Sequence, residues 1–229
     1  MLKFLSAQSS LHLGLIFLIE NLIVTGIALI SGWFILKLSR KPIKAATQSE
    51  ILTCLLTNCI NTIITYVGFR LWQTGYIIFH FQLTWHILTD FFLLFMAMDL
   101  AMYIFHYFIH NSFVYNLVHR FHHNYSDPIP IDLFVLHPIE TISFGCLWIS
   151  VIYLINFNFY AVLIYLVVNV IFGIAGHLGI EPLPSKLRNT ILFKYLGTSS
   201  FHHRHHSDVH YNYGFYTNLW DKLFRTYKK

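Results

Sequence analysis

The chain alternates long apolar stretches with short polar ones. Apolar runs extend from about residue 11 to 38, where Glu20 and Asn21 interrupt the run, from 51 to 72 and from 76 to about 105. Each reaches the roughly 20 residues that a helix needs to cross a bilayer. A fourth region, 141–175, is too long for one span and is broken at 156–158, so we expect two spans joined as a hairpin. The pattern predicts an all-α polytopic membrane helical bundle of about four to five spans.

Composition supports this prediction. Hydrophobic residues make up 56% of the 229 residues and charged residues only 11%, far from the average of soluble proteins. The length fits a single integrated domain. Within it we separate an N-terminal transmembrane region, residues 1–94, from a region that carries the candidate chemistry, residues 95–229.

The basic residues predict how the chain is oriented. The short loop after the first run carries Lys37, Arg40, Lys41 and Lys44. Under the positive-inside rule this loop is cytoplasmic, and counting five spans from it places residues 106–140 and the tail after 176 on the same side. Flanking loops account for most of the net charge of +5, and no nucleic-acid motif accompanies it, so we expect a membrane partner and no nucleic acid.

Histidines carry the candidate chemistry. Eight of the fifteen fall into three clusters: His106 and His110; His119, His122 and His123; His202, His205 and His206. Residues at i, i+3 and i+4 share one helix face, so each cluster aims its imidazoles at one point. Neutral imidazole is the commonest metal ligand. The three clusters supply more nitrogen donors than one ion can use, which predicts a centre of two ions in a histidine-rich helical cap on the cytoplasmic face.

Other histidines are less decisive. His203 lies inside the last cluster, but a helix would point it elsewhere, and His210 lies near a predicted turn, so both stay unassigned. His137 and His177 stand singly beside spans at the same membrane face. Judged by the residues alone, each fits an interfacial or capping role as well as a ligand role.

A polar stripe precedes the first cluster. Asp99, Tyr103, His106 and His110 are spaced by four, three and four residues, which puts them on one face of a helix. A carboxylate beside a ligating histidine can accept the proton of its other ring nitrogen and so fix the ring. The alternative is an aspartate that only caps a buried polar contact.

The donor set favours iron. Structural zinc is usually closed by four ligands, whereas iron takes up to six and oxygen chemistry needs positions left open. Two irons with about five protein nitrogens each would use the whole inventory. A histidine-rich metal transporter, or a metal-binding scaffold without oxidase activity, is the alternative. A transporter predicts ligands at mid-membrane depth, whereas these clusters follow or separate the spans.

The motifs resemble those of the fatty acid hydroxylase and sterol desaturase superfamily, over roughly Phe95 to Tyr227. The shared elements are the three histidine boxes, Asp99-Leu100 with Tyr103, residues 137–140, Gly176-His177, residues 212–214 and residues 220–224. This chain departs from the typical Trp-Asp-x-Leu-Phe-Gly-Thr ending, because Arg225 stands where that pattern has glycine.

The resemblance implies a membrane-bound non-haem di-iron enzyme that uses dioxygen to hydroxylate or desaturate a lipid, such as a sterol or a fatty acyl chain. The implied metal ligands are His106, His110, His119, His122, His123, His137, His177, His202, His205 and His206. Asp99, Tyr103 and Glu140 are expected to support them. We find no cytochrome b5-like or flavin-binding module in the chain, so we expect a separate electron-transfer protein. The expected membrane is a bacterial inner membrane or the endoplasmic reticulum.

Overall fold

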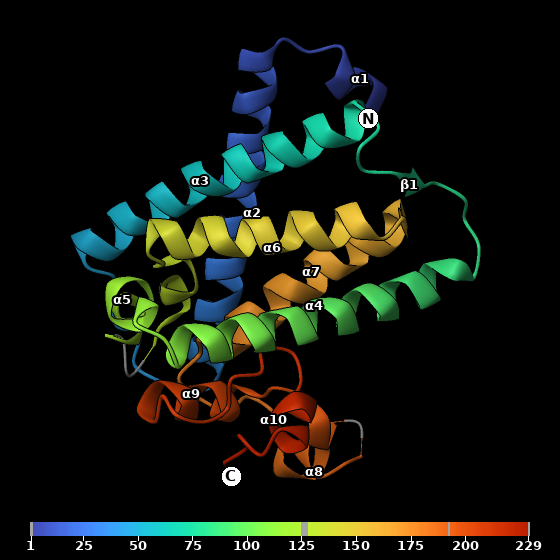
Figure 1. Ribbon diagram of the computed structural model, residues 1–229. Helices are drawn as coiled ribbons and strands as arrows, with labels where there is room; N and C mark the ends of the chain where they lie inside the picture. The colour runs from blue at the N-terminus through green and yellow to red at the C-terminus, as the bar shows by residue number, and fades with distance from the viewer. Residues whose placement is uncertain (1, 125–127, 192, 229) are drawn as a thin grey trace.

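Long apolar helices form the body of the computed structural model, which describes residues 2–124, 128–191 and 193–228 (Figure 1). They are α2 (Ser10–Leu38), α3 (Gln48–Gln73), α4 (His86–His110), α6 (Pro138–Leu154) and α7 (Phe159–Gly176). Four of them are long and apolar enough to cross a membrane, and α6 is a shorter apolar helix. The predicted all-α polytopic membrane fold is therefore confirmed.

The fourth apolar region divides as expected. Helix α6 ends at Leu154 and α7 begins at Phe159, so the break falls on the polar interruption of the sequence. Asn158 caps α7, since its side-chain oxygen accepts a hydrogen bond from the backbone N–H of Tyr160. A capping box of Thr47 and Glu50 fixes the start of α3 in a similar way.

The third apolar run was predicted to begin its helix near residue 76, and this prediction was wrong. Helix α4 begins only at His86. Before it, the chain turns at Gly75 and forms a short strand, β1 (Phe79–His80), which pairs in parallel with β2 (Phe157–Asn158). Asn158 also donates to the carbonyl of Gln82. Hydropathy alone cannot separate an apolar strand from the start of an apolar helix.

Helices α3, α6 and α4 lie side by side (Figure 1). Helix α2 packs against α3 and α7, while α7 also packs against α4. The main core, between α4 and α7, includes Leu94, Met98, Tyr165 and, from the tail, Tyr216. The outward faces carry exposed apolar side chains such as Phe92, as a bilayer requires.

Short helices lie between and beside the long ones. They are α1 (Leu2–Ser6), the π-helix η1 (Tyr115–His119), α5 (Arg120–His123), η2 (Pro130–Phe134), α8 (Ser185–Arg188), η3 (Phe193–Tyr195), α9 (Ser199–Ser207) and α10 (Leu219–Leu223). Helices α5 and α9 lie at the carboxyl end of α4, and α8 and α10 lie below α4 in Figure 1. The three histidine clusters therefore meet at one end of the bundle.

Candidate metal centre

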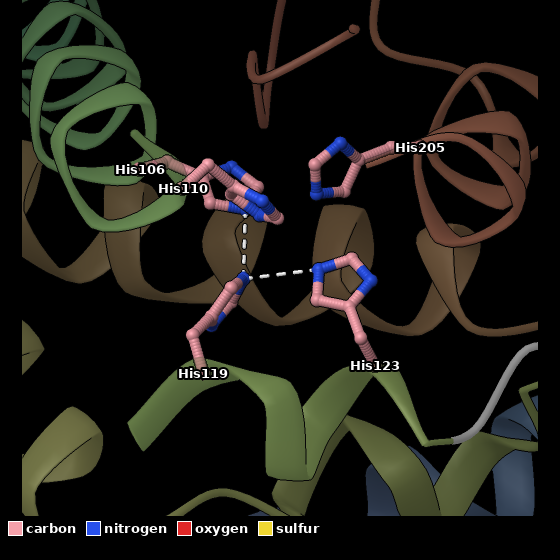
Figure 2. A group of neighbouring side chains, drawn as sticks. All are labelled: His106, His110, His119, His123 and His205. Carbon is pink, nitrogen blue, oxygen red and sulfur yellow. Dashed lines mark hydrogen bonds between the residues drawn. The ribbon is translucent and has the colours of Figure 1, made fainter. Parts of the chain in front are cut away.

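Two groups of histidines meet at this end. The five-histidine group contains His106 and His110 of α4, His119 of η1, His123 of α5 and His205 of α9. One ring nitrogen of each lies within 4.8 Å of the others. Figure 2 shows the rings converging from α4 on one side, η1 and α5 on another, and α9 on a third.

The four-histidine group lies next to it. It contains His122 of α5, His177 directly after α7, and His202 and His206 of α9, all of them buried. Their ligand atoms also lie within 4.8 Å of one another. The ring centroids of His123 and His206 are 4.7 Å apart, so the two groups adjoin.

Each H-x-x-H-H cluster is divided between the groups. His119 and His123, four residues apart, stay together, and His122 joins the other group. In the last cluster His202 and His206 stay together, and His205 crosses over. In a helix with 3.6 residues per turn, neighbouring residues lie about 100° apart around the axis. The adjacent histidines at the end of each cluster therefore point in different directions. A cluster thus faces two points, where we had expected one.

Fixed oxygen atoms orient two rings of the five-histidine group from behind. Nδ1 of His106 donates to the backbone carbonyl of Tyr213 at 2.7 Å. Nδ1 of His119 lies 2.7 Å from Oε1 of Glu140, the carboxylate that we expected to support a ligand. A neutral ring that donates through Nδ1 keeps its lone pair on Nε2, and both Nε2 atoms point into the group.

The same arrangement recurs on two more rings. Nδ1 of His205 donates to the carbonyl of Tyr211 at 2.7 Å, and Nδ1 of His177 donates to the carbonyl of Gly173 at 2.8 Å. A carbonyl can only accept, so these rings also carry their proton on the outer nitrogen. The backbone thereby selects the tautomer that a metal ligand requires.

The inner nitrogens fit a metal ion better than hydrogen bonds. Nε2 of His106 and Nε2 of His119 are 3.1 Å apart, although neither carries a proton in the neutral ring. Two ligand nitrogens at right angles, each about 2.1 Å from an ion, are separated by about 3.0 Å. Nε2 of His205 is buried and has no hydrogen-bond partner within the described structure. A cation between these atoms would satisfy all three.

The rings are neutral, as ligands must be. Burial lowers the pKa of His119 to about 3 and the pKa of His177 to about 4. Burial also holds the pKa values of His202 and His205 well below the ordinary value. At physiological pH these imidazoles therefore present lone pairs rather than positive charge.

A comparison with known protein families covers the part of the chain that carries the grouped histidines. The family model described as fatty acid hydroxylase matches residues 91–226. The chain belongs to this family. No solved structure matches it.

Several curated relatives of this family member are named as enzymes of sterols. It is 30% identical over 131 residues to a Delta(7)-sterol 5(6)-desaturase of Leptosphaeria maculans, covering 57% of this chain and 35% of the relative. It is 31% identical over 133 residues to the lathosterol oxidase of Homo sapiens, covering 57% and 42%. It is 29% identical over 126 residues to methylsterol monooxygenase 1 of Danio rerio, covering 53% and 42%. The match thus spans less than half the length of these relatives.

Asp99, in the family's first motif, does not contact a histidine ring as we had expected. Its fully buried carboxylate accepts hydrogen bonds from the backbone of Tyr216 and Thr217, from the Thr217 hydroxyl and from the Trp220 indole. The structural reason is that the tail folds back along α4 and covers this part of the polar stripe. Asp99 therefore anchors the tail to α4.

Tyr103 has the same role. Its hydroxyl lies 3.0 Å from Oγ1 of Thr226, and its ring stacks on Phe224 with a centroid separation of 5.5 Å. It packs edge-on against Tyr213, whose carbonyl orients His106. Tyr103 thus acts on the five-histidine group through the tail rather than by direct contact with a ligand nitrogen.

One supporting residue was missed from the sequence. Asp221 is fully buried and accepts hydrogen bonds from the backbone N–H groups of Tyr213 and Gly214, both at 2.8 Å, and from the Thr226 hydroxyl. These bonds fix the loop that presents the Tyr213 carbonyl to His106. The family motif at 220–224 marked this aspartate, but nothing in its spacing revealed its partners.

Six of the described histidines lie outside both groups, and three of them, His137, His203 and His210, were considered above. His137 is the N-cap of α6, and its Nδ1 accepts a hydrogen bond from the backbone N–H of Ile139 at 3.3 Å. His203 and His210 are also excluded. For His137 the structure therefore provides a capping contact, and its expected ligand role stays a prediction.

A glycine allows α7 and α9 to meet. A Cβ atom on Gly176 would lie 3.1 Å from Cδ2 of His202, tighter than ordinary contact. The missing side chain lets α9 bring His202 beside His177 at the end of α7, with ring centroids 4.9 Å apart. This explains the Gly176-His177 pair that the sequence singled out.

Proposed function

We propose that this protein is a membrane-bound non-haem di-iron oxidoreductase that uses dioxygen to hydroxylate or desaturate a lipid, either a sterol, a fatty acyl chain or a related molecule. The observation that carries the proposal is the pair of adjoining groups of neutral, buried imidazoles, five and four in number, with their inner nitrogens facing one another. Nine nitrogen donors would hold two irons and leave coordination positions open.

The protein's own groups prepare the site. Bound iron would supply the activation of dioxygen, and the chain supplies orientation and exclusion of water. Glu140 would hold the Nδ1 proton of His119, and the tail carbonyls would do the same for His106 and His205. Tyr115 packs against His110 with ring centroids 5.0 Å apart and covers that side of the group.

The relatives support lipid oxidation in general terms. Their names describe a desaturase, an oxidase and a monooxygenase, so removal of hydrogen and insertion of oxygen both occur among them. We place the histidine end on the cytoplasmic face of a bacterial inner membrane or of the endoplasmic reticulum, because the basic loops flank it. A separate electron-transfer protein would deliver the reducing equivalents.

Two measurements test the proposal. The first is iron per chain in purified protein, for wild type and for His122→Ala and His205→Ala, one from each group; near-wild-type iron in both variants would contradict it. The second is lipid analysis of a host that expresses wild type or His106→Ala. We expect a hydroxylated or desaturated lipid only with wild type, and an unchanged profile beside iron loss would favour metal transport or storage.

A further inference from the structure

A second surface, away from the histidines, combines exposed apolar side chains with positive charge. It is formed by α8, the segment up to η3, and α10, which contact one another: the Asn218 backbone N–H donates to the Tyr195 carbonyl at 2.9 Å, and Lys222 Nζ lies 4.3 Å from the Tyr195 ring centroid. We call it the tail face. Its apolar members are Leu187, Ile191, Leu223 and Phe224, and its cations are Lys186, Lys194 and Lys222.

The exposure of the apolar members is unusual for a surface in water. Ile191 is 83% exposed, Leu223 is 65% exposed and Phe224 is 54% exposed. None of these belongs to a membrane-spanning helix. Large aliphatic side chains gathered on one exposed surface mark a site of interaction with a protein or a membrane.

The acids of the described chain that lie closest in sequence to the tail face have other partners. Asp221 of α10 is itself fully buried, and its oxygens accept hydrogen bonds from the tail backbone. Glu181 is engaged with Ser200 at the start of α9, and Asp208 pairs with Lys228 at 2.7 Å. The lysines therefore offer positive charge to an external partner.

The position of α10 along α4 identifies that partner. Trp220 of α10 donates to Asp99, which lies thirteen residues after the start of α4 at His86. At 1.5 Å per residue this is about 20 Å along the helix, whereas the hydrocarbon core of a bilayer is about 30 Å thick. When α4 crosses the bilayer from His86, the contact between Asp99 and Trp220 therefore lies within the depth of the membrane, and α10 lies against the bilayer.

We propose that the tail face rests in the headgroup layer of an anionic bilayer, with its aliphatic side chains among the upper acyl carbons and its lysines against acidic lipid headgroups. Amphipathic basic surfaces bind membranes in this way, and lysines near an anionic surface strengthen the binding. The segment that carries α8, α9 and α10 would then contact the bilayer directly through α10, in addition to its connection to the membrane through the spans. This inference does not depend on the metal or on the proposed oxidation.

The test reconstitutes the full chain in nanodiscs with one environment-sensitive dye on a cysteine introduced at Ile191, Leu223 or His210, after Cys54, Cys59 and Cys146 are replaced. His210 is exposed, lies outside the tail face and serves as the control. We expect doxyl-labelled lipids to quench the dyes at 191 and 223 at least twofold more than the dye at 210. Iodide in the water should show the reverse order.

A second arm tests the charge. Adding phosphatidylserine to phosphatidylcholine nanodiscs should increase lipid quenching at 223, and Lys194→Glu with Lys222→Glu should abolish the increase. Arg204→Glu, an exposed charge on α9 outside the tail face, should leave it unchanged. The proposal would be overturned if iodide quenched the dyes at 191 and 223 as strongly as the dye at 210 and if doxyl lipids did not quench them. Lipid quenching without dependence on phosphatidylserine would overturn its electrostatic part.

Discussion

The two histidine groups differ in how they are built. In the five-histidine group three rings are only partly buried, and three are oriented by oxygens, two of which belong to the tail. In the four-histidine group all rings are buried, and one, His177, is held by a carbonyl of its own helix. The first group therefore depends on hydrogen bonds to residues outside the group, whereas the second depends on close packing of α5, α7 and α9.

The largest expected effect comes from removing a ligand from each group in turn. His202→Ala would leave three histidines in its group, whereas His110→Ala would leave four in the other. We expect His202→Ala to lose about half of the bound iron and His110→Ala to lose less, because the remaining donors still enclose the ion. Mass spectrometry of metal per chain measures this. His203→Ala is the matched control on α9 and should keep its iron; equal losses in both ligand variants would refute the contrast.

Next in size is the loss of the tail anchor. Asp99→Ala would leave the Trp220 indole and two backbone N–H groups buried without an acceptor, at a cost of about 3 kcal/mol. We expect a lower midpoint of thermal unfolding in detergent and iron loss chiefly from the five-histidine group. Thr89→Ala, on the same helix but exposed, should change neither quantity. An Asp99→Ala protein with unchanged stability and full iron would show that the tail anchor does not support the five-histidine group.

A smaller effect is expected at the carboxylate behind His119. Glu140→Ala removes the acceptor of the Nδ1 proton, and loss of such a partner typically weakens metal binding or activity 10–100-fold. Glu140→Gln keeps an acceptor oxygen and should lose less. Competition with a chelator measures the affinity of each group. Equal weakening of both groups by Glu140→Ala would contradict a role confined to His119.

The smallest effect concerns the turn after α10. Arg225 has a φ of 62° in the left-handed region, and the Thr226 backbone N–H donates back to the Asp221 carbonyl, as in a helix end normally closed by glycine. Arg225→Gly should stabilise the protein by about 1 kcal/mol, measured by thermal unfolding. Arg225→Ala removes the same charge but keeps the Cβ atom, so it should not. If both variants stabilise equally, charge rather than backbone conformation explains the gain.

The sequence predicted the parts of this molecule that depend on period and composition. Apolar runs located the long helices, and the polar break at 156–158 located the turn between α6 and α7. Helical spacing also selected eight of the nine grouped histidines. His177 entered only through the family resemblance, because a single histidine has no period to mark it.

Other features lay beyond sequence reasoning for a physical reason. The acceptors behind His106, His205 and His177 are backbone carbonyls, which every residue has, so no residue type marks them. Asp99 had the correct register for an imidazole partner, but the tail, more than a hundred residues later, supplies its donors. Long-range contacts of this kind are set by the folded chain and not by local spacing.

The support of His106 and His205 by the tail also bears on biosynthesis. The carbonyls of Tyr211 and Tyr213 belong to a loop that Asp221 and Lys228 hold from the far end of the tail, since the Lys228 backbone N–H donates to the Asn212 side chain at 2.8 Å. During synthesis the spans and the first histidines emerge long before this loop exists. The rings of His106 and His205 therefore gain their fixed acceptors only after the ribosome has passed residue 213.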